Sequence, residues 1–522
     1  MTDWGADAAH DTRQHLTHVA RGGAIGLVGA ACSAIAGFAL VLVVTNRFPA
    51  HTAGLFFAAT SLFLLLSAVA TLGSETGLAR FMLRYEAQGR SGDIPPTLRA
   101  AVRPAVVSSL GLAVLLVVLA GPVSRLVGLG QGGQDSVRVL GVLLPFATWS
   151  TLTLAGTRAF GNIRTTVLVD QIARPVAQPV LALVVSLAGA GLLALTVAWA
   201  IPYAMAAVAS AVLSRRFMRR RRAVASGSPT DTYRSLRRDF WSFTWPRAIT
   251  RMAQMAIQRL DIVLVAALRS PAEAAVYTAA TRFVALGQFG TQAIQQVLQP
   301  KFTALLANEE HGSLQEVYKV ATAWSMCIAW PMYLTVGCAP LAYLGVFGKG
   351  YSASATATVV LMSLTMLFAV ASGAADTLLL MSGRSGFSLA NNLVAVALDI
   401  GLCLWLIPHM GITGAAVAWA IASSTRSLCA VLQCRLTLNV ASFGRPALTA
   451  AAANVLCIAV PLLALSLVME VHLMTLLVVL VLAAPAYLGV LWLGRRPLML
   501  GVLRDLVRRR SGRDAQSPQE AA

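Results

Sequence analysis

Five polar residues recur along one apolar run of the sequence, residues 241–268. They follow one another at steps of four, three, four and three, and they are Arg247, Arg251, Gln254, Gln258 and Asp261. This spacing places all five on one face of a helix, and we call them the polar row. Arginine has forked donors that match phosphate oxygens. The row therefore predicts a site for an anion that carries a phosphate or pyrophosphate group.

The next apolar run, residues 273–298, carries further polar side chains. Arg282 lies near its middle, and several glutamines follow it. A charge in hydrocarbon costs roughly 2.5 to 3.5 kcal/mol, and lipid-facing surface does not tolerate many amides. We therefore predict a polar cleft beside these two helices and an ion pair of Asp261 with Arg282. The expected substrate-binding residues are Arg247, Arg251, Gln254, Gln258, Asp261, Arg282, Gln288 and Gln292. The alternative is that Arg247 reaches the headgroups and the others form a helix-packing network.

Two further charged residues are secondary candidates. Arg174 follows Asp170 by four residues in the run 166–188, so an intrahelical ion pair explains it as well as a substrate contact does. Asp399 lies near the middle of the run 386–408, where a packing network is the alternative explanation.

The elements that must position these residues are membrane helices. The chain of 522 residues is 57% hydrophobic and 12% charged, with a mean hydropathy of +0.71, whereas a soluble domain carries roughly 25% charged residues. Crossing the hydrocarbon takes about 20 apolar residues. Runs of that kind number fourteen: 22–45, 53–73, 101–120, 137–157, 166–188, 191–213, 241–268, 273–298, 320–343, 355–380, 386–408, 411–432, 447–469 and 473–494. We predict an all-α polytopic membrane protein.

The net charge of +20 is explained by membrane topology. With a cytoplasmic N-terminus, about 30 of the 41 Lys and Arg residues fall in cytoplasmic segments. We expect both termini in the cytoplasm, a bacterial-type inner membrane, and no nucleic-acid partner. The basic segment Arg215–Arg238 is expected to be a flexible linker that contacts anionic lipids. Residues 1–20 are polar, so we expect the first membrane helix to belong to the mature protein.

Two halves of the sequence repeat at an offset near 220 residues. AGLFFAAT (Ala53–Thr60) returns as AVYTAAT (Ala275–Thr281), and VAWAI occurs at Val197–Ile201 and again at Val417–Ile421. A constant offset indicates duplication. We therefore predict an N-terminal segment (1–21), an N-lobe (22–213), a linker (214–240), a C-lobe (241–432), a helix pair (433–494) and a basic cytoplasmic tail (495–522).

Three segments resemble a known group of transporters. They are RLDIVLVAALRSPAEAAVYTAATRF (Arg259–Phe283), FGKGYSASA (Phe347–Ala355) and IPHMGITGAAVAWAIASS (Ile407–Ser424). Their order and spacing resemble the multidrug/oligosaccharidyl-lipid/polysaccharide (MOP) flippase superfamily, in particular its polysaccharide transporter branch of Wzx-type O-antigen and exopolysaccharide flippases. The resemblance implies two lobes around a cationic cavity that carries a polyprenyl-pyrophosphate-linked oligosaccharide outward by alternating access. It also implies a polysaccharide polymerase and glycosyltransferases as candidate partners.

Other functions leave different marks in the sequence. The run 22–45 has no Asp or Glu, which makes an ion-coupled drug antiporter less expected. The helix expected there offers only Arg21, at its cytoplasmic end, which makes a lipid II flippase less expected. A polysaccharide polymerase or ligase would need a large outside loop with acid/base residues, whereas the outside loops here are short. The seven cysteines have no metal-ligand spacing. We expect no enzyme activity, metal or cofactor.

Overall fold

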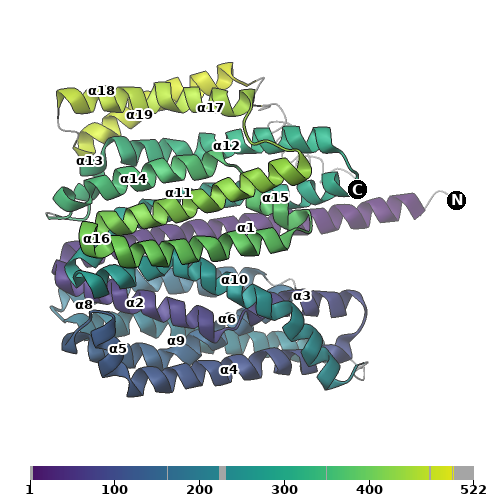
Figure 1. The fold of residues 1–522 in the computed structure, drawn as a ribbon. Coiled ribbons are helices and arrows are strands. Elements are labelled where there is room, and N and C mark those ends of the chain that lie inside the picture. The colour runs from purple at the N-terminus through teal and green to yellow at the C-terminus, as the bar shows by residue number, and fades with distance from the viewer. Residues whose placement is uncertain are drawn as a thin grey trace, which may run out of the picture. The chain divides into compact units, whose positions relative to one another are not determined.

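The computed structural model describes residues 4–160, 163–222, 231–348, 350–469, 472–495 and 498. Every regular element in this part of the chain is helical, which confirms the all-α prediction (Figure 1). The α-helices up to the linker are α1 (Trp4–Arg47), α2 (Ala50–Ala70), α3 (Ser74–Ala87), α4 (Ile94–Val118), α5 (Ala120–Leu126), α6 (Gln134–Ala159), α7 (Ile163–Thr166), α8 (Arg174–Leu187) and α9 (Leu192–Arg222).

After the linker, the α-helices are α10 (Tyr233–Leu268), α11 (Pro271–Ala307), α12 (His311–Cys338), α13 (Pro340–Gly345), α14 (Ser352–Ala371), α15 (Ala375–Met381), α16 (Ser385–Leu438), α17 (Arg445–Asn454), α18 (Val460–Val468) and α19 (Leu473–Leu493). Short 3-10 segments are η1 (Ser91–Asp93) and η2 (Gln131–Gly133), and π-helical segments are η3 (Val167–Ala173) and η4 (Val455–Ala459).

All fourteen predicted runs lie in helical parts of the chain, some with a break inside. Among the described residues, nine helices are long and apolar enough to cross a membrane, and a tenth is the bent pair α14 and α15. The helices α10, α11 and α12 are not among them, although each exceeds 25 residues. The count of fourteen spans therefore stays a prediction.

The long helix α16 contains two of the predicted spans. Its backbone leaves the helical region at Gly411, where φ is 60° and ψ is −137°. A Cβ atom added at Gly414 would lie 2.4 Å from the backbone oxygen of Leu406, so the two arms approach closely beside the turn. The glycines of the segment Ile407–Ser424 thus make a helical hairpin between the runs 386–408 and 411–432.

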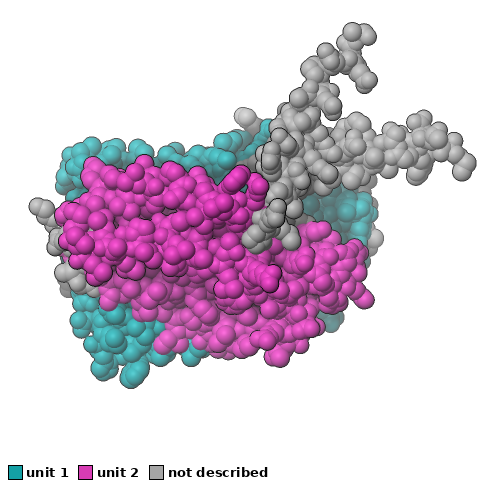
Figure 2. All heavy atoms as spheres, turned by 90° about the horizontal axis from the view of Figure 1, so that it is seen from above, with its two compact units in different colours: residues 1–282, 396–419 teal, residues 283–395, 420–522 magenta. Residues whose placement is uncertain are grey.

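The chain forms two compact units, which Figure 2 distinguishes by colour. Unit 1 comprises residues 1–282 and 396–419. One part of its core packs Leu78, Phe81 and Tyr85 of α3 against Phe240 of α10. Another joins Phe63 of α2 to the aromatic rings of α9. These contacts fix α10 beside α2, α3 and α4.

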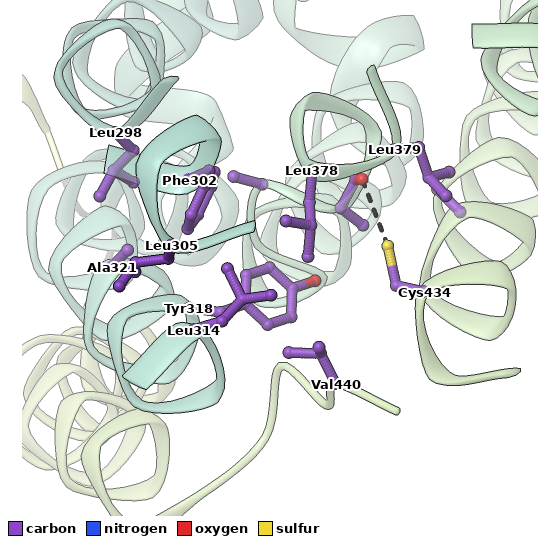
Figure 3. Packing of buried hydrophobic residues seen from close by; sticks show 13 residues of the cluster. Leu298, Phe302, Leu305, Leu314, Tyr318, Ala321, Leu378, Leu379, Cys434 and Val440 are labelled. Atoms are coloured by element: carbon purple, nitrogen blue, oxygen red, sulfur yellow. Dashed lines mark hydrogen bonds between the residues drawn. The ribbon is translucent and has the colours of Figure 1, made fainter. Parts of the chain in front are cut away.

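Unit 2 comprises residues 283–395 and 420–522. In one of its cores Phe302 of α11 and Tyr318 of α12 pack edge to face, with Leu378 of α15 nearby (Figure 3). The thiol of Cys434 donates to the backbone oxygen of Ala375 in the same region. Edge-to-face aromatic pairs and buried leucines stabilise such a core by dispersion and close packing.

The predicted domain boundaries stay predictions. Within the predicted linker, α9 continues to Arg222 and α10 begins at Tyr233, while residues 223–230 lie outside the described part of the chain. Most of the predicted C-terminal tail, from residue 499 onward, also lies outside it. The predicted N-terminal segment is helical from Trp4, as part of α1.

Candidate functional site

The single helix α10 carries the whole polar row. It runs without interruption from Tyr233 to Leu268, so the four-and-three spacing does place the five residues along one side. The side chains of Arg247, Arg251 and Gln258 are exposed, Gln254 is half-buried, and Asp261 is buried. The row therefore divides into an exposed part with two arginines and a buried end with a carboxyl group.

The exposed arginine Arg251 has a partner on another helix. Its Nε atom lies 3.3 Å from Oε1 of Glu75, in the first turn of α3. Glycines bring the two helices together. A Cβ atom at Gly73 would lie 2.8 Å from Cα of Ala248, and one at Gly77 would lie 2.3 Å from Oγ1 of Thr244. We call this contact of Gly73, Glu75 and Gly77 with Thr244, Ala248 and Arg251 the α3–α10 seam.

A second arginine joins Arg247 at this surface. The guanidinium of Arg247 lies 4.5 Å from the centre of the Phe243 ring, and that of Arg80 lies 4.1 Å from the same centre. Both arginines are exposed. The sequence reasoning did not select Arg80 as a site residue. The signal that could have found it is the repeat, which matches Arg80 with the basic Lys301.

The buried end of the row is a separate cluster. The hydroxyl of Tyr277 donates to Oδ2 of Asp261 at 2.6 Å, and the backbone amide of Ile262 donates to Oδ1 at 2.8 Å. Arg259 and Arg282 both interact electrostatically with this carboxyl. The expected ion pair of Asp261 with Arg282 stays a prediction, and the contact with Tyr277 was missed. Asp261 and Tyr277 are two of the residues on which the family resemblance rests.

The secondary candidates also lie in unit 1. Arg174 forms the intrahelical ion pair with Asp170 at 2.9 Å, and its guanidinium lies 4.6 Å from the centre of the Tyr203 ring. Asp399 is 2% exposed, accepts from the thiol of Cys403 at 3.9 Å, and interacts electrostatically with Asp261. Asp399 therefore joins the buried cluster around Asp261, whereas Arg174 has its own partners.

The two glutamines of the predicted site belong to unit 2. Gln288 is half-buried and Gln292 is exposed, both on α11. Arg282 is the last residue of unit 1 on the same helix. The assignment of Gln288 and Gln292 to the substrate site stays a prediction.

A second set of ion pairs connects the loop after α3 to Asp231, which lies two residues before α10. Arg90 contacts the carboxylates of Asp93, at 2.6 Å, and of Asp231. The backbone amide of Asp231 donates to Oδ1 of Asp93 at 3.3 Å. The hydrogen bonds to Asp231 and Asp93 raise the pKa of the Arg90 guanidinium above its ordinary value. Arg90 therefore stays charged and holds the two segments together.

The arrangement of helices matches solved transporters. "Lipid II flippase MurJ, inward closed conformation" aligns with a TM-score of 0.72 and 12% identity, over 90% of this chain and 99% of that one. An inward-facing multidrug resistance MATE family transporter of the MOP superfamily aligns with a TM-score of 0.63 and 14% identity, over 78% of this chain and 94% of that one. A MOP superfamily transporter from Pyrococcus furiosus aligns with a TM-score of 0.55 and 14% identity, over 81% of this chain and 95% of that one. The fold is that of the MOP superfamily of multi-pass membrane transporters.

The sequence comparison is more specific. The model of the family described as "Polysaccharide biosynthesis protein" matches residues 57–356, which is more than half of the chain. The chain therefore belongs to the polysaccharide biosynthesis protein family. The family and the fold together confirm the resemblance that the motifs predicted. No curated protein matches the chain at a significant level.

Proposed function

We propose that this protein is a flippase that moves a polyprenyl-pyrophosphate-linked oligosaccharide from the inner to the outer leaflet of the bacterial cytoplasmic membrane by alternating access. The observation that carries the proposal is the pair of exposed arginines, Arg247 and Arg251, on a helix of a MOP-fold protein from a polysaccharide biosynthesis family. A guanidinium in membrane surroundings is costly unless an anion compensates it. A pyrophosphate offers oxygens that match its forked donors.

The charge of the site separates this function from the runner-up. An ion-coupled multidrug antiporter shares the fold, as the MATE family structure illustrates. A cationic drug would meet the repulsion of Arg80, Arg247 and Arg251 at the exposed end of the row. A pyrophosphate is attracted by the same three residues. We propose transport without covalent chemistry, so a polymerase or ligase is the less favoured alternative.

Replacing Arg251 by alanine tests the proposal. We expect at least a tenfold loss of surface polysaccharide, because the proposed charge-assisted contact of the Arg251 guanidinium with the pyrophosphate is removed. The matched control is Arg269→Ala. Arg269 is the residue directly after α10; it is also exposed, but it pairs with Glu273 and not with Glu75. The measurement is polymer on the cell surface at equal membrane levels of the two proteins. Unchanged polymer in the Arg251→Ala strain would remove Arg251 from the site.

The substrate class is tested in a deletion strain. We expect lipid-linked saccharide to accumulate in the inner leaflet, because its synthesis continues while export stops. An antiporter would instead leave the lipid-linked pool unchanged and make the cells sensitive to cationic dyes. That second outcome would refute the flippase proposal.

A further inference from the structure

The partner of Arg251 has the wrong charge to belong to a site for pyrophosphate. Glu75 would repel the substrate that Arg251 is proposed to bind. Its side chain is 20% exposed, and that of Arg251 is 44% exposed. The closest approach of the pair is 3.3 Å, longer than the 2.7 to 2.9 Å of a strong charge-assisted hydrogen bond. The pair is close enough to neutralise Arg251 and loose enough to be exchanged.

Glu75 lies on an element with a strained attachment. Between α2 and α3 the backbone passes through two left-handed residues, Leu72 with φ 49° and Gly73 with φ 67°. A left-handed conformation is costly for leucine, and such strain persists only where surrounding contacts hold it. Directly after Leu72, Gly73 lies against Ala248 in the α3–α10 seam. The first turn of α3 is therefore held against α10 directly after a left-handed turn of the backbone.

The two helices run antiparallel along the whole of α3. Gly73 meets Ala248, Gly77 meets Thr244, and beyond the end of α3 Arg90 meets Asp231. At one end Glu75 of α3 pairs with an arginine of α10, and at the other Arg90, which follows α3, pairs with Asp231, which precedes α10. Only the Glu75 end involves an arginine of the polar row.

We propose that Glu75 is the resident counter-ion of Arg251 in the empty protein, and that the phosphate of the lipid-linked substrate replaces it and so releases the first turn of α3 from α10. This inference rests on the proposed function, because it assumes that Arg251 receives a phosphate. The exchange keeps Arg251 compensated in both states. It also makes Glu75 a specificity-determining residue, since a neutral or cationic ligand cannot take its place.

Binding to purified protein tests the exchange. The full-length chain in lipid nanodiscs is titrated with undecaprenyl pyrophosphate, and the Kd is measured by native mass spectrometry. We expect Glu75→Gln to bind about two- to fivefold more tightly than wild type, because a partly exposed competing ion pair is removed. Arg251→Gln should bind at least tenfold more weakly, and the double variant should bind like Arg251→Gln.

Two further variants control for the loss of a carboxylate. Glu273→Gln breaks the pair with Arg269, which has the same 3.3 Å separation but no residue of the polar row, and its Kd should equal that of wild type. Glu75→Asp keeps the charge on a shorter side chain and should remain near wild type. Hydrogen exchange of the peptide 74–87 gives an independent measure of release. It should increase in wild type on adding undecaprenyl pyrophosphate and be high already in ligand-free Glu75→Gln.

The outcomes separate the two proposals. If wild type binds, Arg251→Gln weakens binding, and Glu75→Gln has the Kd of wild type or a higher one, the counter-ion exchange is wrong and the flippase proposal stands. Exchange of the peptide 74–87 that does not respond to ligand overturns the release of α3. If wild type binds undecaprenyl pyrophosphate no better than undecaprenol, both the site and the exchange are refuted.

Discussion

At the scale of single residues, two side chains of the polar row have partners on other helices, Arg251 with Glu75 of α3 and Asp261 with Tyr277 of α11. The steps from Arg247 to Gln258 required only that α10 be continuous, which it is. The contact of Arg251 with Glu75 depends on the approach of α3, which no periodicity within α10 encodes. The hydroxyl that donates to Asp261 comes from Tyr277 on α11, and no spacing within α10 encodes that contact either. The expected ion pair of Asp261 with Arg282 stays a prediction. Local spacing fixes a face, and tertiary packing selects the partner.

The Tyr277 hydroxyl bond should contribute more than a bond between neutral groups. Tyr277→Phe removes a donor at 2.6 Å from a buried carboxyl, and hydrogen bonds to charged groups are worth about 1.5 to 3 kcal/mol. The control Tyr333→Phe removes an equally buried hydroxyl that donates to the backbone oxygen of Val284 at 3.2 Å, where about 0.5 to 1.5 kcal/mol is expected. The thermal midpoint in detergent should fall further for Tyr277→Phe. An equal fall of the thermal midpoint in both variants would show that the hydrogen bond to Asp261 stabilises the protein no more than the bond to the backbone oxygen of Val284 does.

At the scale of elements, glycines determine which helices meet. Gly73 and Gly77 stand four residues apart, as small residues do where two membrane helices approach closely. The sequence GSETG was therefore a readable signal for the seam, although not for its partner helix. The hairpin of α16 was predicted as two separate spans, and Gly411 supplies the turn between them. The predicted run 53–73 ends at the break after α2, but the left-handed backbone of Leu72 in that break could not be predicted from its residue type.

Alanine at Gly73 should be costly for two separable reasons. Its left-handed φ of 67° costs an alanine roughly 1 to 2 kcal/mol, and the added Cβ would overlap Ala248, which adds about 1 to 3 kcal/mol. Gly89→Ala is the matched control, since Gly89 has φ 68° and a Cβ there would meet nothing within 4 Å. Thermal stability in detergent should fall for both variants and further for Gly73→Ala. If Gly89→Ala loses as much thermal stability as Gly73→Ala, the overlap with Ala248 of α10 contributes nothing to the loss.

At the scale of the whole molecule, composition and charge predicted the class of protein. In lipid, a continuous run of about 20 apolar residues satisfies its backbone hydrogen bonds within a helix, so the all-α prediction followed from the length of the apolar runs. The number of spans did not follow as simply. The polar residues of α10 and α11 that we propose for the substrate site also lower the hydropathy of these helices, so neither helix counts as a membrane span by length and composition. The polar residues that favour a substrate site therefore also lower the number of membrane spans that hydropathy predicts.

The expected orientation is testable by labelling. Cysteine at Ala188, exposed between α8 and α9, should react with a membrane-impermeant maleimide on intact cells, because that loop is expected outside. Cysteine at Asn308, exposed between α11 and α12, should react only after lysis. All seven natural cysteines are buried or half-buried, so wild type provides the baseline. The reverse pattern of labelling would invert the topology and place the basic loops outside.

The π-helical segment Val167–Ala173 shifts the surface of the span that it interrupts. Exposed positions follow at steps of three or four from Val176 through Val180 and Val184 to Leu187, but the step from Leu168 to Ala173 is five. A wide turn contains one residue more than an α-helical one. Related chains with an ordinary turn here are therefore expected to be one residue shorter. An alignment without a gap at this place would assign exposed positions to the interior for the rest of the helix.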